Sequence, residues 1–217
     1  MEITKLKING RKLYIIDNVL NHNKIHDIYA ACVSSEYTMK QLSDGLHHVP
    51  NLRMSHHIET ADEIDYIFKD LFKAQKKILK YFNLWKKVET ADVYINMADA
   101  LTTMLPHADR PEGNWTLLYY ANKNWDKTYS GATNFFNEHD DEIAFSCLPK
   151  PGRFVLFPAD ILHQALPPTH FCPYKRFTIA FKMDTLPKLK PKEKSDYNCE
   201  EFETETREVI HATNTCW

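Results

Sequence analysis

From about residue 90 the hydrophobic pattern of the chain changes to a period of two residues, and this change constrains the fold more than any other feature. A period of two is typical of β-strands, whose alternate side chains point to opposite faces. The runs are short, and turn-forming sequences such as "PEGN" and "KPG" separate them. They are ADVYINM, WTLLYYAN, GATNFF, IAFSCL, RFVLFP and RFTIAFKM, which begin at residues 91, 115, 131, 143, 153 and 176. Short strands at this spacing predict a sandwich or a small barrel, whose interior can hold one small ligand.

The first third of the chain is predicted to be mainly helical. After one expected strand over residues 11–20, the polar Asn21 and Asn23 begin a segment with helical character up to residue 33. Thr60 and Glu63 have the spacing of a capping box, in which each side chain accepts a backbone N–H at the start of a helix. Apolar residues then repeat at helical spacing as far as residue 82. They are Ile64, Ile67, Phe68, Leu71, Ile78, Leu79 and Phe82.

These patterns indicate one domain over residues 1–183. Residues 1–89 would form a helical support with an N-terminal strand, and residues 90–183 would form the β core. At 217 residues and 43% hydrophobic content, the chain is long enough for one large core. Residues 184–217 are interpreted as a C-terminal extension, which begins rich in proline and lysine and then becomes acidic.

Composition excludes several classes of protein. With 27 Lys and Arg against 29 Asp and Glu, the net charge is -2, so we expect neither nucleic acid nor an anionic membrane as a partner. Five cysteines at irregular spacing argue against a disulfide framework and a zinc ribbon. No segment has the pattern of a signal peptide or a membrane span. We therefore expect a cytoplasmic protein, either a monomer or a homodimer.

His107 and Asp109 lie just before the strand that begins at residue 115. On extended backbone, residues two apart project to the same side, so both side chains can point at one ion. A third ligand from a facing strand would complete the set of two histidines and one carboxylate that is typical of non-haem Fe(II) oxygenases. Our candidate is His163, which lies 56 residues further on, after an apolar run.

Other histidines offer competing interpretations, because the chain has eleven of them. His139 and Asp141 have the same spacing but lie in a polar stretch expected to be a hairpin loop, which would hold an ion poorly. His57 and Glu59 directly precede the capped helix instead of lying in a barrel strand. We interpret them, together with His56, as ordinary surface or core residues, and we interpret His47 and His48 in the same way.

Arg176 opens the last strand of the pattern, where alternation places it on one face with Thr178 and Ala180. If that face points into the barrel, the guanidinium needs an anion, and a carboxylate is its natural partner. Tyr120 lies on a strand face where its hydroxyl could donate a second hydrogen bond to that carboxylate. A surface or ion-paired arginine and a core tyrosine remain the alternatives.

Taken together, the motifs "HAD", "TLLYYANKNWD", "SGATNFF", "PKPGRFVLFPADILH" and "RFTIAFK" resemble the Fe(II)/2-oxoglutarate-dependent dioxygenases, in particular their prolyl-hydroxylase-like branch. The resemblance runs from about residue 91 to residue 183. It implies a mainly β (α+β) fold, a double-stranded β-helix or cupin-like jelly-roll, with helices packed against one face. It also implies iron ligands at His107, Asp109 and His163. Arg176, Tyr120 and Thr178 would bind the far carboxylate of 2-oxoglutarate.

The resemblance further implies an enzyme that uses Fe(II), 2-oxoglutarate and O2, with ascorbate as an optional reductant. Such an enzyme hydroxylates an unactivated C–H bond while 2-oxoglutarate is decarboxylated to succinate. A protein side chain is the expected substrate, and a free amino acid or another small metabolite is the alternative. A non-catalytic barrel that binds metal or 2-oxoglutarate and a zinc hydrolase with the same ligands are the rival classes.

Overall fold

The computed structural model describes residues 1–42, 51–102, 104–137, 139 and 141–187, and Met1–Pro187 form one compact unit. Most strands belong to one large antiparallel sheet, and three more form a smaller one. In spatial order the large sheet contains β1 (Glu2–Ile8), β2 (Arg11–Asp17), β9 (Phe154–Pro158), β6 (Trp115–Tyr120), β11 (Arg176–Thr185), β5 (Val88–Ala98), β4 (Asn51–His57) and β3 (Thr38–Leu42). The small sheet contains β10 (His163–Ala165), β7 (Thr133–Phe136) and β8 (Ile143–Cys147).

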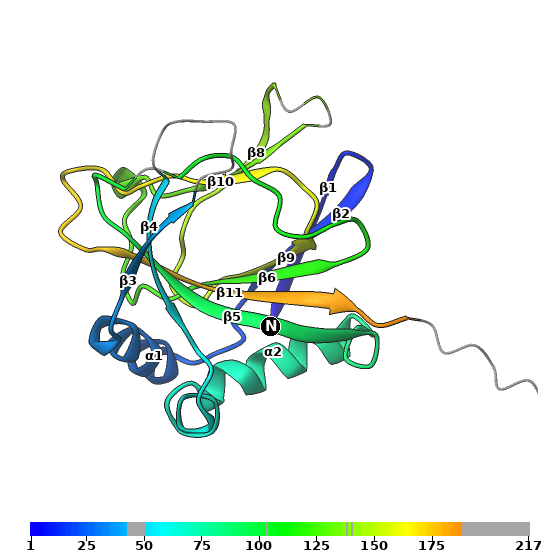
Figure 1. The fold of residues 1–217 in the computed structure, drawn as a ribbon, viewed down its shortest axis with the longest axis horizontal. Coiled ribbons are helices and arrows are strands. Elements are labelled where there is room, and N and C mark those ends of the chain that lie inside the picture. The colour runs from blue at the N-terminus through cyan, green and yellow to red at the C-terminus, as the bar shows by residue number, and fades with distance from the viewer. Residues whose placement is uncertain (43–50, 103, 138, 140, 188–217) are drawn as a thin grey trace, which may run out of the picture. The chain divides into compact units, whose positions relative to one another are not determined.

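The two sheets and two helices are arranged in layers. The small sheet lies over one side of the large sheet, and α1 (His22–Ser34) and α2 (Lys69–Tyr81) cover the other side (Figure 1). A short 3-10 turn, η2 (Lys127–Tyr129), precedes β7. This arrangement agrees with the jelly-roll barrel expected from the sequence, and it leaves the space between the sheets for a site.

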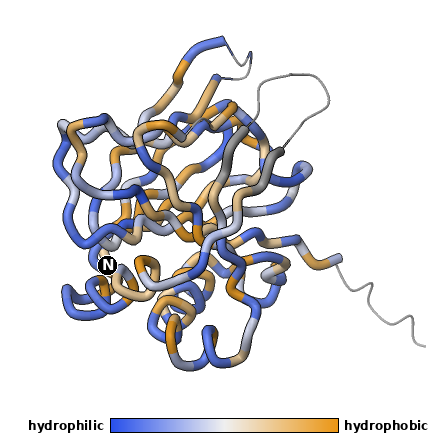
Figure 2. The backbone as a smooth tube through the Cα atoms, turned by 60° about the vertical axis from the view of Figure 1, so that its left-hand side comes forward, coloured by the Kyte–Doolittle hydropathy of each residue, from blue (hydrophilic) through white to orange (hydrophobic). Residues whose placement is uncertain are grey.

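The helices bury one face each against the large sheet. In α1 the buried residues are Ile25, Ile28 and Cys32, and in α2 they include Leu71 and Ile78. In Figure 2 hydrophobic segments gather where the layers meet, and hydrophilic ones predominate at the outer loops. Within the described residues, no helix combines the length and the apolar character that a membrane span requires.

The start of the second helical segment confirms the capping box but departs from a regular α-helix. Glu63 N donates to Thr60 Oγ1 at 3.2 Å, and Thr60 N donates to Glu63 Oε2 at 3.0 Å. The next turn, η1 (Glu63–Ile67), is a π-helix, in which Phe68 N donates to Glu63 O at 2.7 Å. This wider turn contains one extra residue, which shifts the apolar face. Ile67, expected on that face, is therefore 53% exposed.

The prediction of a helical N-terminal third was incomplete, because residues 1–89 also supply β1 to β4. Sequence reasoning missed β1, β3, β4 and β10. Three of these four, β1, β3 and β10, are edge strands of their sheets, and edge strands are often short or carry charged side chains, which weakens their apolar pattern. The last strand also continues past residue 183, since Thr185 pairs with Val88. The expected extension from residue 188 onward lies outside the described residues.

We predict that Glu63→Ala lowers the free energy of unfolding by about 1 kcal/mol at neutral pH, because it removes the capping box. Burial alone would raise the pKa of the Glu63 carboxyl, but hydrogen bonds from His56 and Thr60 outweigh it and lower the pKa to about 2. This stabilisation is therefore complete above the unfolded-state pKa, ~4.3, and is lost as the pH falls towards 2.

The measurement is urea unfolding of both proteins between pH 7 and pH 2.5, and the difference between them should shrink at the acid end. Glu59→Ala is the control, because that side chain is 76% exposed. A difference that does not depend on pH would contradict the assignment.

Candidate active site

Backbone pairing brings the distant histidines of the site together. His107 N donates to His163 O at 2.9 Å, and His163 N donates to His107 O at 3.0 Å, as in an antiparallel ladder. Two residues along, Asp109 N donates to Ala159 O at 2.7 Å. The segment with His107 and Asp109 is thereby fixed against the segment that leads into β10, where His163 is the first residue.

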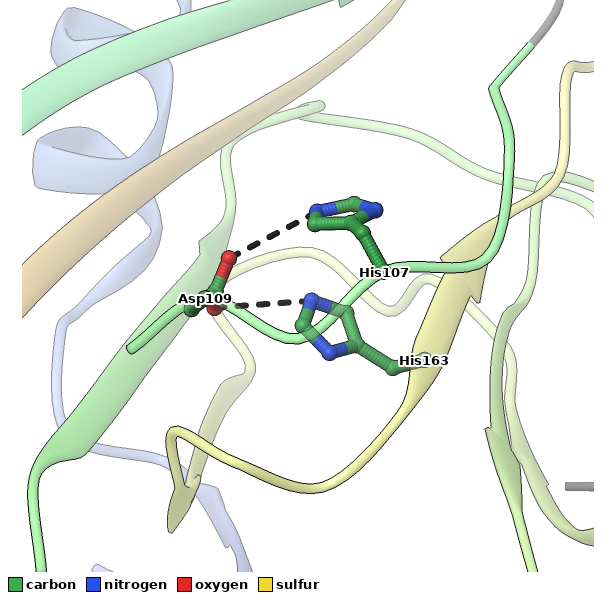
Figure 3. A group of neighbouring side chains, drawn as sticks. All are labelled: His107, Asp109 and His163. Atoms are coloured by element: carbon green, nitrogen blue, oxygen red, sulfur yellow. Dashed lines mark ion pairs between the residues drawn. The ribbon is translucent and has the colours of Figure 1, made fainter. Parts of the chain in front are cut away.

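The side chains of these three residues converge on one point (Figure 3). His107 Nε2 lies 3.5 Å from Asp109 Oδ1, and His163 Nε2 lies 3.4 Å from Asp109 Oδ2. One potential ligand atom from each residue lies within 4.8 Å of the others, and in the described part of the chain no other group of three such residues is found. Three side chains that can bind a metal, one carboxylate and two imidazoles, therefore meet at one point of the structure.

Hydrogen bonds on the far side of each ring orient the two imidazoles. His107 Nδ1 lies 3.0 Å from Leu105 O, and His163 Nδ1 lies 2.9 Å from Ile161 O. A carbonyl can only accept, so the proton of each neutral ring resides on Nδ1 and the Nε2 lone pair faces Asp109. Partners of this kind are typical of histidines that bind metals through Nε2.

The protonation states of the triad suit a cation. Burial alone would raise the pKa of the Asp109 carboxyl, but the neighbouring charges of His163 and Lys182 hold that pKa well below its usual range. Burial lowers the pKa of His163 to about 4, because the charged imidazolium would lose its water. At neutral pH Asp109 is thus an anion and His163 a neutral ligand.

The competing pairs of the sequence analysis lie elsewhere. Asp141 Oδ1 accepts a hydrogen bond from Asn137 Nδ2 at 2.7 Å, and His139 is exposed. His56 contacts Glu63 in the capping box, and His57 lies 3.5 Å from Glu59. Neither pair belongs to a group of three ligands among the described residues. His47 and His48 lie outside the described residues.

A cavity of about 270 Å³ adjoins the triad. Residues from both sheets line it: His107 and His163, apolar residues such as Leu118 and Phe157, and Arg176. The strand alternation proposed for β11 is correct, since Arg176, Thr178 and Ala180 all line the cavity. The site therefore combines a candidate metal centre with an enclosed space for a small ligand.

Arg176 is a buried cation that lines the cavity. It is 1% exposed, and its Nε donates to Gly131 O at 2.7 Å while its guanidinium also donates to Thr133 Oγ1 at 3.0 Å. In the described part of the chain no carboxylate lies within ion-pair distance of it, and burial lowers its pKa. A buried charge of this kind costs several kcal/mol unless it is compensated. The residues of the cavity therefore fit an anionic ligand, and a carboxylate matches the guanidinium geometry.

Tyr120 and Thr178, the other predicted partners of that carboxylate, differ in position. Thr178 lines the cavity, and its Oγ1 lies 3.4 Å from Arg176. Tyr120 does not belong to the cavity lining; its hydroxyl lies 2.8 Å from Thr133 Oγ1 and 3.2 Å from Cys147 O. The Tyr120 ring lies 5.5 Å from the guanidinium carbon of Arg176, so Tyr120 supports the arginine from behind. Thr133 lines the cavity and accepts hydrogen bonds from both Tyr120 and Arg176.

Sequence reasoning also missed several residues of the cavity, and the most important is Lys182. The same alternation that identified Thr178 continues to Lys182, so the signal was present but was not followed far enough. Thr116 on β6 could have been found in the same way, because it shares a face with Leu118. Tyr94 and Asn96 line the cavity from β5, where nothing in the sequence distinguishes them.

Comparison with known proteins agrees with this geometry. Residues 94–182 match the model of the 2OG-Fe(II) oxygenase superfamily. Among solved structures, the chain is similar to a prolyl hydroxylase from Trichoplax adhaerens, which was solved in complex with a hypoxia inducible factor oxygen degradation domain peptide fragment. The TM-score is 0.62 at 17% sequence identity, and the match covers 81% of this chain and 83% of that chain. A prolyl-4-hydroxylase from Pseudomonas putida has a TM-score of 0.60 and 15% identity, covering 78% and 91%. A search of curated proteins gives no match.

The chain thus has the fold of these enzymes, and residues 94–182 match the family model of the 2OG-Fe(II) oxygenases. The predicted double-stranded β-helix and the predicted Fe(II), 2-oxoglutarate and O2 are thereby confirmed, as is the expectation of an enzyme.

We predict that Gly131→Ala weakens 2-oxoglutarate binding by about tenfold, because Gly131 forms the wall against Arg176. A Cβ there would lie 2.7 Å from Trp125 Cζ2, which must shift, and 3.2 Å from Arg176 Cδ, so the arginine must also give way slightly. The measurement is the dissociation constant of 2-oxoglutarate with Mn(II) as a redox-stable metal.

Gly113→Ala is the matched control. Gly113 also has a positive φ, +90°, but a Cβ there meets no atom within 4 Å. Both variants carry backbone strain, and only Gly131→Ala disturbs the arginine. Equal effects of the two substitutions on affinity would contradict the role given to Gly131.

Proposed function

We propose that this enzyme hydroxylates an unactivated C–H bond of an uncharged protein side chain, with proline as the first candidate. In the balanced reaction, R–H, O2 and 2-oxoglutarate give R–OH, succinate and CO2, and each product R–OH and succinate receives one atom of O2. The observation that carries the proposal is the buried Arg176, which lies in the same cavity as His107 and His163 and has no carboxylate partner among the described residues.

Two groups of residues act in this proposal, the metal-binding triad and the residues that bind 2-oxoglutarate. His107, Asp109 and His163 hold Fe(II), which supplies the redox chemistry of O2 when bound. Arg176 and Thr178 bind the far carboxylate of 2-oxoglutarate, with Thr133 holding the guanidinium in place. These contacts set the orientation of 2-oxoglutarate, because its keto-acid end faces the metal and its far carboxylate faces Arg176.

The size and lining of the cavity favour a side chain that enters from outside. At about 270 Å³, the cavity is at the lower limit of small-molecule sites. The keto acid would fill much of it, leaving room for one target side chain and not for a second whole metabolite. Met104, Leu105 and Pro106 supply an apolar stretch beside His107 that can exclude water from the reacting atoms.

The charges of the lining favour an uncharged target. Arg176 and Lys182 are cations, and no described residue of the lining is acidic. A lysine or arginine side chain would have to lose its water beside these cations and the metal, which is unfavourable. A proline ring brings no such cost, and the Trichoplax relative is a prolyl hydroxylase with a bound peptide.

We predict that the protein with Fe(II), O2 and 2-oxoglutarate releases succinate, and that proline peptides stimulate release more than lysine peptides do. Arg176→Met should raise the 2-oxoglutarate concentration required by at least ~30-fold, because losing a buried charged partner costs ~2–5 kcal/mol. Arg176→Lys should keep part of the affinity.

Arg153→Met is the matched control, because Arg153 is a largely buried arginine that pairs with Asp17 outside the cavity lining. It should lower stability and leave the 2-oxoglutarate requirement unchanged. The proposed pose is wrong if Arg176→Met turns over 2-oxoglutarate with the requirement of the unmodified enzyme.

A further inference from the structure

Lys182 is a second buried cation of the cavity, and the reaction proposed above gives it no role. It is 6% exposed and lies on the same face of β11 as Arg176. Its Nζ forms an ion pair with Asp109 Oδ2 and lies 5.6 Å from the centre of the Tyr94 ring. Lysine is rarely buried to this degree unless it is paired, so the ion pair explains its position.

The contacts of Asp109 divide unequally between its two oxygens. Oδ2 accepts a hydrogen bond from Thr116 Oγ1 at 2.7 Å and also contacts Lys182. Oδ1 faces His107 Nε2 at 3.5 Å. The adjacent cation, Arg110, is directed elsewhere, to Asp92 and Asp184. Among the described residues, Lys182 is therefore the lysine that pairs with the Asp109 carboxylate, whose side chain is 2% exposed.

A divalent metal would compensate the same carboxylate. Two cations that share one buried anion repel each other, and this repulsion is strong where water is excluded. Lys182 therefore stabilises the protein most when no metal is bound, and it opposes the metal when one arrives. A lysine that only oriented Asp109 would have the opposite effect, because its loss would weaken metal binding.

We propose that Lys182 is an internal counter-ion of Asp109, which keeps the site folded without metal and lowers its affinity for a divalent cation. This inference rests on the proposed function in one respect, the assignment of Asp109 as a metal ligand. Its consequence is an enzyme whose metal occupancy follows the supply of free Fe(II), because the empty site remains stable.

The test is Lys182→Met, which keeps the length of the side chain and removes its charge. We measure the dissociation constant of Mn(II) by calorimetry, and the melting temperature with and without Mn(II). The variant should bind Mn(II) about tenfold more tightly than the unmodified protein, and Mn(II) should raise its melting temperature more. Equal or weaker Mn(II) binding would overturn the proposal.

Two further variants separate charge from general disturbance. Lys182→Arg keeps the charge and should bind Mn(II) like the unmodified protein. Lys80→Met removes an exposed lysine of α2 and should change neither quantity. If Lys182→Met can be recovered folded only in the presence of Mn(II), the proposal is upheld. A variant that unfolds equally with and without Mn(II) contradicts it.

A double-mutant comparison tests whether the effect passes through Asp109. In an Asp109→Asn background, adding Lys182→Met should no longer tighten Mn(II) binding, because the shared anion is gone. If Lys182→Met still tightens Mn(II) binding in the Asp109→Asn protein, the counter-ion role is overturned. Failure of the proposed reaction would instead be seen as an unmodified enzyme that binds Mn(II) but releases no succinate.

Discussion

The two backbone hydrogen bonds between His107 and His163 are the constraint on which the rest of the site depends. They join segments 56 residues apart and set both rings beside Asp109, while the carbonyls of Leu105 and Ile161 fix which nitrogen of each ring faces inward. These hydrogen bonds are part of the backbone pairing of the barrel itself. The metal ligands are therefore prearranged by the fold and do not rely on flexible loops.

The cavity is organised by charge as much as by shape. Arg176 has no carboxylate partner among the described residues, whereas Lys182 is paired with Asp109. Arg176 can thus bind an anionic ligand, whereas Lys182 compensates the charge of Asp109, a proposed metal ligand. Gly131 and Thr133 hold the guanidinium from the small-sheet side, and Tyr120 supports it from behind. In the proposed function, this division favours an acidic co-substrate and disfavours a cationic target side chain.

Much of the fold and of the candidate site could be predicted from the sequence, because period-two alternation and ligand chemistry are local signals. The strands of the core, both helices and the convergence of His107, Asp109 and His163 follow from them. Three kinds of feature could not be predicted from such local signals. The edge strands β1, β3 and β10 carry too little apolar sequence, and the extra residue of the π-turn at Glu63–Ile67 has no signal in the spacing of the apolar residues. The capture of the Tyr120 hydroxyl by Thr133 and Cys147 depends on tertiary contacts that no spacing reveals.

In the proposed site, one small cavity holds a metal and the keto acid in contact with each other, with Arg176 at the far end. The most direct measurement is a calorimetric titration of 2-oxoglutarate into the protein with and without Mn(II), in the absence of O2. The account predicts that Mn(II) tightens 2-oxoglutarate binding by at least ~10-fold, with an equal effect of 2-oxoglutarate on Mn(II), because coupling of two ligands is reciprocal. Independent binding of the two ligands would contradict it.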